Sequence, residues 1–139
     1  MIPLIVTAGI LRDKDRLLIT LRPPESRHPG YWEFPGGKLM ADESPEAALK
    51  REFDEELAIS VSVGGIFDVV YHRYPWGPVL LLAYECTWVS GTIHHLGVAD
   101  HRWVRAAELS QFELLPADRP LVDRLQSQPA GCAGSFRDR

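Results

Sequence analysis

The chain is poor in cysteine. Its 139 residues include two, Cys86 and Cys132, and their spacing matches no metal-ligand motif. A cysteine-based metal site is therefore excluded. Cys86 lies in an apolar run, where a buried free thiol is the expected state. Free thiols favour a reducing compartment, so we expect a cytoplasmic protein.

A surplus of positive charge is also missing. There are 15 Lys and Arg residues against 19 Asp and Glu residues, for a net charge of −4, and the basic residues are scattered along the chain. Binding to duplex nucleic acid depends on a concentrated basic surface, so that class of partner is excluded. A small-molecule nucleotide is the more natural partner for this chain.

No apolar run is long enough to cross a bilayer. Residues 1–11 are apolar, but they lack a basic leader and are followed by the charged run 12–16. We therefore expect no membrane association, and we interpret this segment as a strand. The length and the 45% hydrophobic content fit a single domain over residues 1–127. Residues 128–139, rich in small and polar types, are predicted to be a flexible tail.

What the sequence does have is a cluster of carboxylates. Glu52, Glu55 and Glu56 are spaced i, i+3 and i+4, so on a helix they share one face. They fall near the expected C-terminal end of that helix, where the macrodipole disfavours negative charge. Stability alone does not favour this arrangement, whereas hard cations such as Mg²⁺ or Mn²⁺ require it. The alternative is a solvated acidic helix face.

The helix that carries these acids has clear local signals. Ser44 is placed as an N-cap, with Pro45 at the first helical position. Leu49, Phe53 and Leu57 recur every four residues and form an apolar stripe beside the acidic one. The helix can therefore pack on a sheet and still present its acids to a cleft.

The remaining pattern predicts an α/β protein. We expect a hairpin of strands 2–11 and 17–22, strands 60–63 and 66–71 broken by Gly64 and Gly65, and a turn at 74–78. The nearly continuous apolar run 79–89 predicts a central strand that is covered on both faces. A short strand at 103–104 and short helices at 106–112 and 118–125 complete the order.

Glycine and charged residues recur around the acidic helix at fixed offsets: Gly37, Glu43, Arg51, Glu52, Glu55 and Glu56. This pattern resembles the signature of the Nudix hydrolases, which hydrolyse nucleoside diphosphates linked to another moiety. Residues 32–38 are similar to the approach to that motif in the MutT-like branch, and flanking similarity runs from residue 5 to about residue 125. The resemblance implies a Nudix fold, with a mixed β-sheet between α-helices.

The resemblance also implies roles for individual residues. Glu52, Glu55 and Glu56 would be ligands of Mg²⁺ or Mn²⁺, or the base that positions water, and the Gly36 carbonyl would join them. Arg51 would orient these acids, its alternative being a surface ion pair. Six residues are candidates for substrate binding: Arg22, which would contact phosphate or form a surface salt bridge, Phe34, Gly37, Lys38, Tyr74 and Asp118. Glu43 is expected to close the loop before the helix.

Two departures from the family pattern stand out. Ala58 takes the place of a helix-terminating glycine, so we expect the helix end to differ locally. Many relatives carry a further Glu in the loop before the equivalent of Trp103, and Gly97 stands there. Asp100 is the nearest carboxylate and our candidate replacement. Three histidines are further candidates, or solvated loop residues: His94, His95 and His101.

The choice of base depends on weaker signals. The segment around Asp118 resembles the base-contacting loop of MutT-like enzymes, especially the CTP pyrophosphohydrolases, because a carboxylate accepts from the cytosine amine. An oxidised guanine also offers N–H donors, and Asp118 has an alternative role as an N-cap. Tyr71, Tyr74 and Trp76 would stack on a base or simply pack.

These observations predict a Mg²⁺-dependent nucleoside triphosphate pyrophosphohydrolase, acting as a monomer or homodimer on cytosine-type or oxidised nucleotides. Three alternatives remain: an 8-oxo-dGTP diphosphatase, a catalytically silent nucleotide-binding module, and an enzyme for dinucleotide or sugar-linked substrates.

Overall fold

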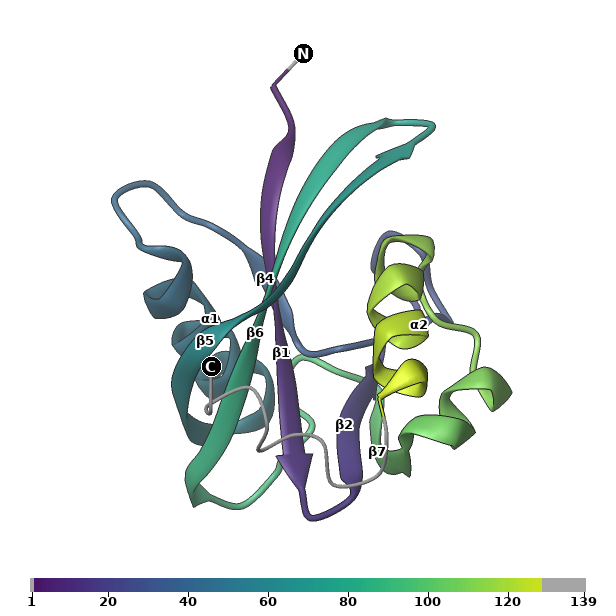
Figure 1. Cartoon of the computed structure of the whole chain (residues 1–139). Coiled ribbons are helices and arrows are strands. Elements are labelled where there is room, and N and C mark those ends of the chain that lie inside the picture. Colours follow the sequence, from purple (N-terminus) through teal and green to yellow (C-terminus); the bar gives the residue numbers. More distant parts are fainter. Residues whose placement is uncertain (1, 129–139) are drawn as a thin grey trace.

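The structure, a computed structural model of the chain, describes residues 2–128. It shows a mixed sheet with helix α1 (Pro45–Leu57) on one side and helix α2 (Arg119–Ser127) on the other (Figure 1). The strands, in chain order, are β1 (Leu4–Asp13), β2 (Arg16–Leu21), β3 (Trp32–Glu33), β4 (Gly36–Lys38), β5 (Ile59–Tyr74), β6 (Gly77–Gly91) and β7 (Asp100–Arg105). The predicted sheet between helices is confirmed.

Strand β1 organises the sheet. It pairs with β6 in parallel over residues 4–11 and with β4 antiparallel over residues 6–8. Its far end turns into the predicted hairpin with β2, and β2 in turn pairs with β3 and β7. Strand β6 lies between β1 and β5, so the apolar run at 79–89 is indeed a central strand. Because β4 pairs with β1, the glycines of β4 are fixed opposite Thr7 and Ala8 of β1.

The prediction that Gly64 and Gly65 break the chain into two strands is wrong. Strand β5 continues through both glycines, and the pairing with β6 shifts register between Val63 and Ile66. The extra residue on β5 is absorbed as a bulge, for which glycine is well suited. The long antiparallel pairing with β6 therefore outweighs the weak strand propensity of the glycine pair.

Helix α1 begins as its cap residues predict. The Ser44 side chain accepts a hydrogen bond from the Ala47 N–H at 3.1 Å, and Pro45 takes the first helical position. The expectation of a different helix end is wrong, because Ala58 itself adopts the left-handed conformation, with φ of 60°. Its N–H donates to the Asp54 carbonyl at 3.0 Å, so the usual C-terminal cap forms without glycine.

The C-terminal part differs in detail from the prediction. The segment expected to be a helix at 106–112 is a 3₁₀ helix, η1 (Ala106–Gln111), and a short turn, η2 (Pro116–Asp118), precedes α2. The predicted tail lies outside the described residues except for Gln128. Within residues 2–128, no helix has the length and apolar character needed to cross a membrane.

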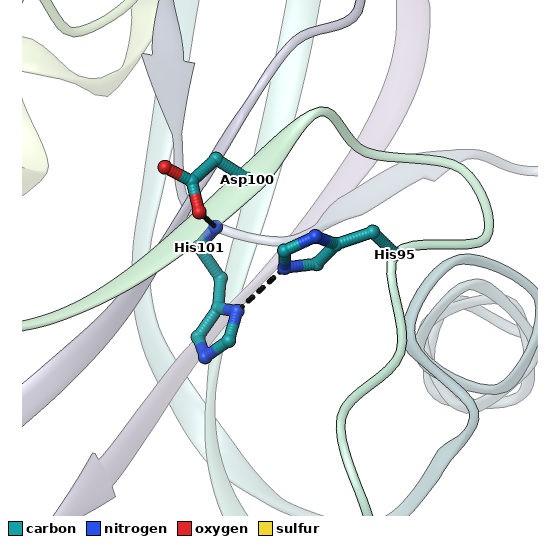
Figure 2. Close-up of side chains that lie close together, drawn as sticks. All are labelled: His95, Asp100 and His101. Carbon is teal, nitrogen blue, oxygen red and sulfur yellow. Dashed lines mark hydrogen bonds between the residues drawn. The ribbon is translucent and has the colours of Figure 1, made fainter.

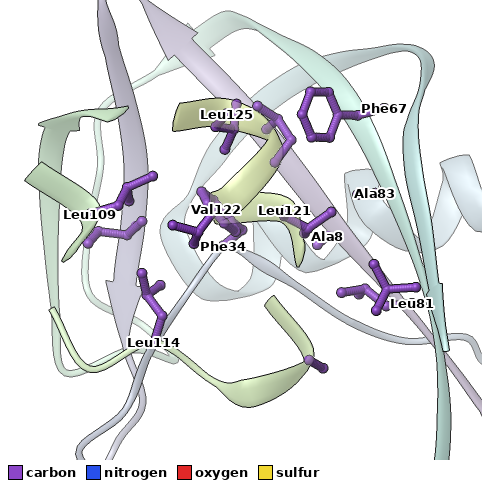
Figure 3. Packing of buried hydrophobic residues seen from close by; sticks show 14 of the residues in the cluster. Ala8, Phe34, Phe67, Leu81, Ala83, Leu109, Leu114, Leu121, Val122 and Leu125 are labelled. Carbon is purple, nitrogen blue, oxygen red and sulfur yellow. The ribbon is translucent and has the colours of Figure 1, made fainter. Parts of the chain in front are cut away.

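Two apolar cores lie on opposite sides of the sheet. Leu49, Phe53 and Leu57 of α1 are fully buried in one of them, as the stripe predicts. The other packs α2 and η1 against the sheet (Figure 3), and its labelled members include Phe34, Leu121 and Leu125. The α1 core holds the acid-bearing helix in place, so the acids need not contribute to folding.

Candidate active site

The acidic face of α1 borders a cavity of about 590 Å³. Glu52 and Glu56, one helical turn apart, both line it together with β4 and residues of β1 and β6. Glu55 is turned away: its side chain is 55% exposed, and it lies outside the cavity lining. The structure thus brings two of the three predicted carboxylates into one cavity.

Arg51 connects the acids to the loop before the helix. Its guanidinium donates to Glu43 at 2.6 and 3.0 Å, to Glu52 at 2.7 Å and to Glu55 at 3.1 Å. It also donates to the Lys38 carbonyl at 3.1 Å, and this bond links the backbone of β4 to the acidic helix. These charge-assisted bonds hold the Glu52 carboxylate at a defined position.

Glu52 and Glu56 interact across one helical turn, and this interaction favours the protonated form of Glu56. Burial, together with the charges of Glu52 and Glu33, raises the pKa of Glu56 to about 8. Burial also raises the pKa of Glu52, against the opposing effect of Arg51. A pair of buried, incompletely neutralised carboxyls is a donor set that fits a hard divalent cation, which would compete with a proton for their oxygens.

The two glycines of β4 are required by close contacts. A Cβ on Gly37 would lie 2.5 Å from the Glu52 carboxyl carbon, and one on Gly36 would overlap the Thr7 carbonyl of β1. The Thr7 hydroxyl donates to the Gly37 carbonyl at 3.1 Å, which fixes β4 further. Glycine at these positions lets the backbone lie directly against the acidic face.

Glu33 is a site residue that sequence reasoning missed. It lines the cavity from β3, and Arg22 donates to it at 2.9 Å, so the predicted Arg22 is paired inside the site. Burial raises the pKa of Glu33 despite this partner. Its position within residues 32–38, next to the acidic motif, was the signal that would have found it.

Asp118 lines the same cavity from the opposite side and is 4% exposed. It occupies the N-cap position of α2, but its side chain makes no capping bond there. Its Oδ2 instead accepts from the Phe34 N–H at 3.1 Å, which links it to the segment before β4. Burial, reinforced by the charge of Glu33, raises the pKa of Asp118 to about 8.

Aromatic side chains line the cavity mouth. Tyr74 and Trp76 are stacked with ring centroids 5.2 Å apart, and Trp76 donates to His28 at 3.3 Å. The Arg27 guanidinium lies 4.0 Å from the Trp76 ring centroid. Sequence reasoning missed both His28 and Arg27, which come from the loop after β2 and carried no motif. The other predicted aromatic candidate, Tyr71, is 57% exposed and lies outside the lining.

Tyr74 and Phe34 contribute to the cavity wall mainly through buried rings, being 6% and 2% exposed. The Tyr74 hydroxyl accepts from the Ala117 N–H at 3.1 Å, so the ring holds the segment that carries Asp118. These two rings therefore shape the cavity and position its polar groups.

The loop before β7 approaches the acids at one point. A Cβ on Gly97 would lie 3.0 Å from Glu56 Cγ, so Gly97 packs against the acidic helix. Asp100 lies outside the cavity lining. Its carboxylate accepts from the His101 N–H (Figure 2) and from Arg102, each at 2.8 Å. Its predicted role as a replacement for the loop Glu stays a prediction.

The comparisons with known proteins agree with this geometry. A family model described as the NUDIX domain matches residues 1–125. The CTP pyrophosphohydrolase of Escherichia coli strain K12 is 35% identical over 122 residues, covering 85% of this chain and 87% of that protein. The 8-oxo-dGTP diphosphatase of Proteus vulgaris is 45% identical over 71 residues, covering 50% of this chain and 63% of that protein.

Solved structures give the same result. The solution structure of the E. coli ORF135 protein matches with a TM-score of 0.78 at 32% identity and covers 91% of each chain. The MutT protein from Methanosarcina mazei Go1 matches with a TM-score of 0.80 at 26% identity, covering 89% of this chain and 94% of the other. The fold, the acid-lined cavity and the family match over most of its length show that this chain belongs to the Nudix family.

Proposed function

We propose that the chain is a nucleoside triphosphate pyrophosphohydrolase that converts a triphosphate and water into a monophosphate and pyrophosphate. Nudix hydrolases act on small nucleotides and generally use a divalent metal. The observation that carries the proposal is that Glu52 and Glu56 line one cavity, where Arg51 holds Glu52 and Gly37 approaches it closely. We infer a cytoplasmic enzyme that acts as a monomer or homodimer.

The acids of α1 would hold Mg²⁺ or Mn²⁺. Glu52, Glu56 and the Gly36 carbonyl are the inner candidates, with Glu55 at the exposed edge. When bound, the cation neutralises the charge of the phosphate oxygens. Arg51 keeps Glu52 in place, and Glu56 is either a further ligand or the group that takes a proton from the attacking water.

Arg22 and Lys38 supply positive charge at the cavity, although Arg22 is already paired with Glu33. A triphosphate would therefore compete with Glu33 for Arg22. Trp76, stacked on Tyr74, is the exposed ring of this pair, and a base that stacked on it would compete with the Arg27 guanidinium, which lies 4.0 Å from its ring centroid. Phosphate recognition and base recognition are thus assigned to opposite parts of one cavity.

Asp118 is our candidate for the choice of base. Since the Phe34 N–H occupies Oδ2, Oδ1 is the oxygen left for a ligand. An exocyclic amine, as on cytosine, would donate to Oδ1 of the ionised carboxylate, and this hydrogen bond would favour the ionised form over the protonated one. In Asp118→Asn the Phe34 N–H would hold the amide oxygen, and the amide NH₂ would then oppose the ligand's amine. Oxidised guanine also carries an exocyclic amine, so the choice between the two bases is further supported by the similarity to the relative named CTP pyrophosphohydrolase, and we favour cytosine-type nucleotides over 8-oxo-dGTP.

The test is kcat/KM for CTP, dCTP and 8-oxo-dGTP, with separate detection of pyrophosphate and orthophosphate. We expect pyrophosphate as the product and a preference for cytosine. A mispaired buried polar group costs about 1–3 kcal/mol, so Asp118→Asn should change the cytosine to oxoguanine ratio about tenfold or more. Asp123→Asn, on the exposed side of α2, is the matched control.

Two results would contradict the proposal. Release of orthophosphate alone would exclude hydrolysis of the triphosphate to a monophosphate and pyrophosphate. If Asp118→Asn leaves the ratio of kcat/KM for cytosine nucleotides and 8-oxo-dGTP unchanged, Asp118 serves only to bind the Phe34 N–H. The proposed preference for cytosine would then lose its support.

A further inference from the structure

Two imidazoles and one carboxylate meet where the loop of residues 92–99 enters β7 (Figure 2). His95 Nε2 and His101 Nδ1 are 2.8 Å apart, and the ligand atoms of His95, Asp100 and His101 all lie within 4.8 Å of one another. None of the three lines the nucleotide cavity. We propose that these residues bind a borderline divalent cation of the Zn²⁺ type, separately from the hard cation expected at α1.

The ligand chemistry selects this class of ion. Two imidazole nitrogens and one carboxylate oxygen, with a further position open to solvent, are a donor set found for Zn²⁺ in proteins. Mg²⁺ prefers oxygen ligands in octahedral geometry, so it competes poorly for such a site. The two sites would therefore prefer different cations: the oxygen ligands at α1 would favour Mg²⁺, and the mainly nitrogen ligands here would favour Zn²⁺.

The two imidazole nitrogens are close to the spacing that a shared ion requires. With Zn–N bonds of about 2.0–2.1 Å, two tetrahedral ligand nitrogens lie roughly 3.3–3.4 Å apart. His95 Nε2 and His101 Nδ1, 2.8 Å apart, would have to separate by about half an ångström. His95 is exposed and free to make this movement. The ion would replace the single hydrogen bond that now joins the two rings.

The backbone holds the ligands in place before an ion arrives. The His94 N–H donates to the Leu57 carbonyl at 2.9 Å, and the Gly97 N–H donates to the Glu56 carbonyl at 3.1 Å. His101 is fixed within β7, where it pairs with Thr20 of β2. A loop anchored on both sides of His95 loses little conformational freedom on binding.

The neighbouring contacts allow ligation. The Asp100 carboxylate accepts from the His101 N–H and from Arg102, but a carboxylate has about four acceptor positions, so neither bond must break. The Arg102 side chain is 54% exposed, and solvent screens its charge.

A bound ion would connect the loop of residues 92–99 to β7. Because the same loop packs on the end of α1 through the Glu56 carbonyl, the ion would stiffen one wall beside the acidic helix. The predicted consequence is a Zn²⁺-dependent rise in melting temperature that is independent of nucleotide.

The test is calorimetric titration of the whole chain with Zn²⁺ in excess Mg²⁺, which occupies the oxygen-rich site. We expect one Zn²⁺ per chain and at least tenfold weaker binding in His95→Gln and in His101→Gln. His94→Gln, the neighbouring histidine outside the cluster, is the matched control and should bind as the wild type does. Melting temperatures without Zn²⁺ would confirm that each variant is folded.

Equal Zn²⁺ binding by the wild type, His95→Gln and His101→Gln would overturn the proposal. Loss of the Zn²⁺ signal in Glu52→Gln, with the signal retained in His101→Gln, would do so as well, because the ion would then lie at α1.

Discussion

Gly37→Ala tests whether the position of the Glu52 carboxylate matters for catalysis. The new Cβ would lie 2.5 Å from the Glu52 carboxyl carbon and from Oε2, where ordinary contacts begin at 3.4 Å. Glu52 would have to retreat by 3.4 − 2.5 = 0.9 Å. Arg51 resists this movement, since it holds Glu52 at 2.7 Å and is itself held by Glu43 at 2.6 Å.

A misplacement of about 1 Å at a reacting centre costs roughly 10²-fold in rate. This corresponds to about 2.7 kcal/mol in the activation free energy. The loss of folding stability should be smaller, because Glu52 borders a cavity into which it can move. We therefore expect kcat to fall about 10²-fold and the apparent affinity for Mg²⁺ to weaken.

The assay is pyrophosphate release at saturating nucleotide over a range of Mg²⁺ concentrations. Gly65→Ala is the matched control, because a Cβ there has no atom within 4 Å. If Gly37→Ala retains kcat within about threefold of the wild type, a defined position of Glu52 is not needed, and the argument from close contact is refuted.

Two further predictions concern stability. Ala58→Gly should raise the unfolding free energy by about 0.5–1 kcal/mol, because it relieves the left-handed strain at φ of 60° at some entropic cost. Urea denaturation would measure this, and Ala47→Gly, at an exposed position of α1, should instead destabilise. The second concerns Asp118, whose pKa of about 8 in the folded state exceeds the unfolded value of about 3.9. Its contribution to stability is full below about pH 4 and is lost as the pH rises to about 8, since the unfolded state ionises first. The melting temperature of Asp118→Asn relative to the wild type should thus rise between about pH 5 and pH 8, and a constant difference would contradict the assigned burial.

Local signals predicted the acidic helix well. Ser44 and Pro45 act within one turn of the chain, and the spacing of the acids and apolar residues follows from helix geometry alone. Such features depend on neighbours in sequence, so they could be predicted without the sheet. The prediction of a strand break at Gly64 and Gly65 was wrong because these residues are held in β5 by pairing with β6. That strand lies about 20 residues further along the chain, so its effect has no local signal.

The composition of the cavity was only partly predictable. Glu33 and Arg22 meet because β2 and β3 pair, and Asp118 contacts a backbone N–H that is 84 residues away in the chain. The sequence correctly placed Asp118 at the N-cap position of α2, but its side chain accepts a hydrogen bond from the Phe34 N–H and not from the helix. Contacts of this kind are set by the tertiary fold and leave no periodic signal in the chain.

The central claim is that Glu52 and Glu56 of α1, with a divalent cation, catalyse hydrolysis of a nucleoside triphosphate to a monophosphate and pyrophosphate. The most direct measurement is kcat for pyrophosphate release from CTP as a function of Mg²⁺, in the wild type and in Glu56→Gln, with Glu46→Gln as an exposed control on the same helix. We predict no turnover in excess chelator, and a loss of about 10²-fold or more in Glu56→Gln that additional Mg²⁺ does not restore. Full turnover in chelator, or wild-type kcat in Glu56→Gln, would contradict the account.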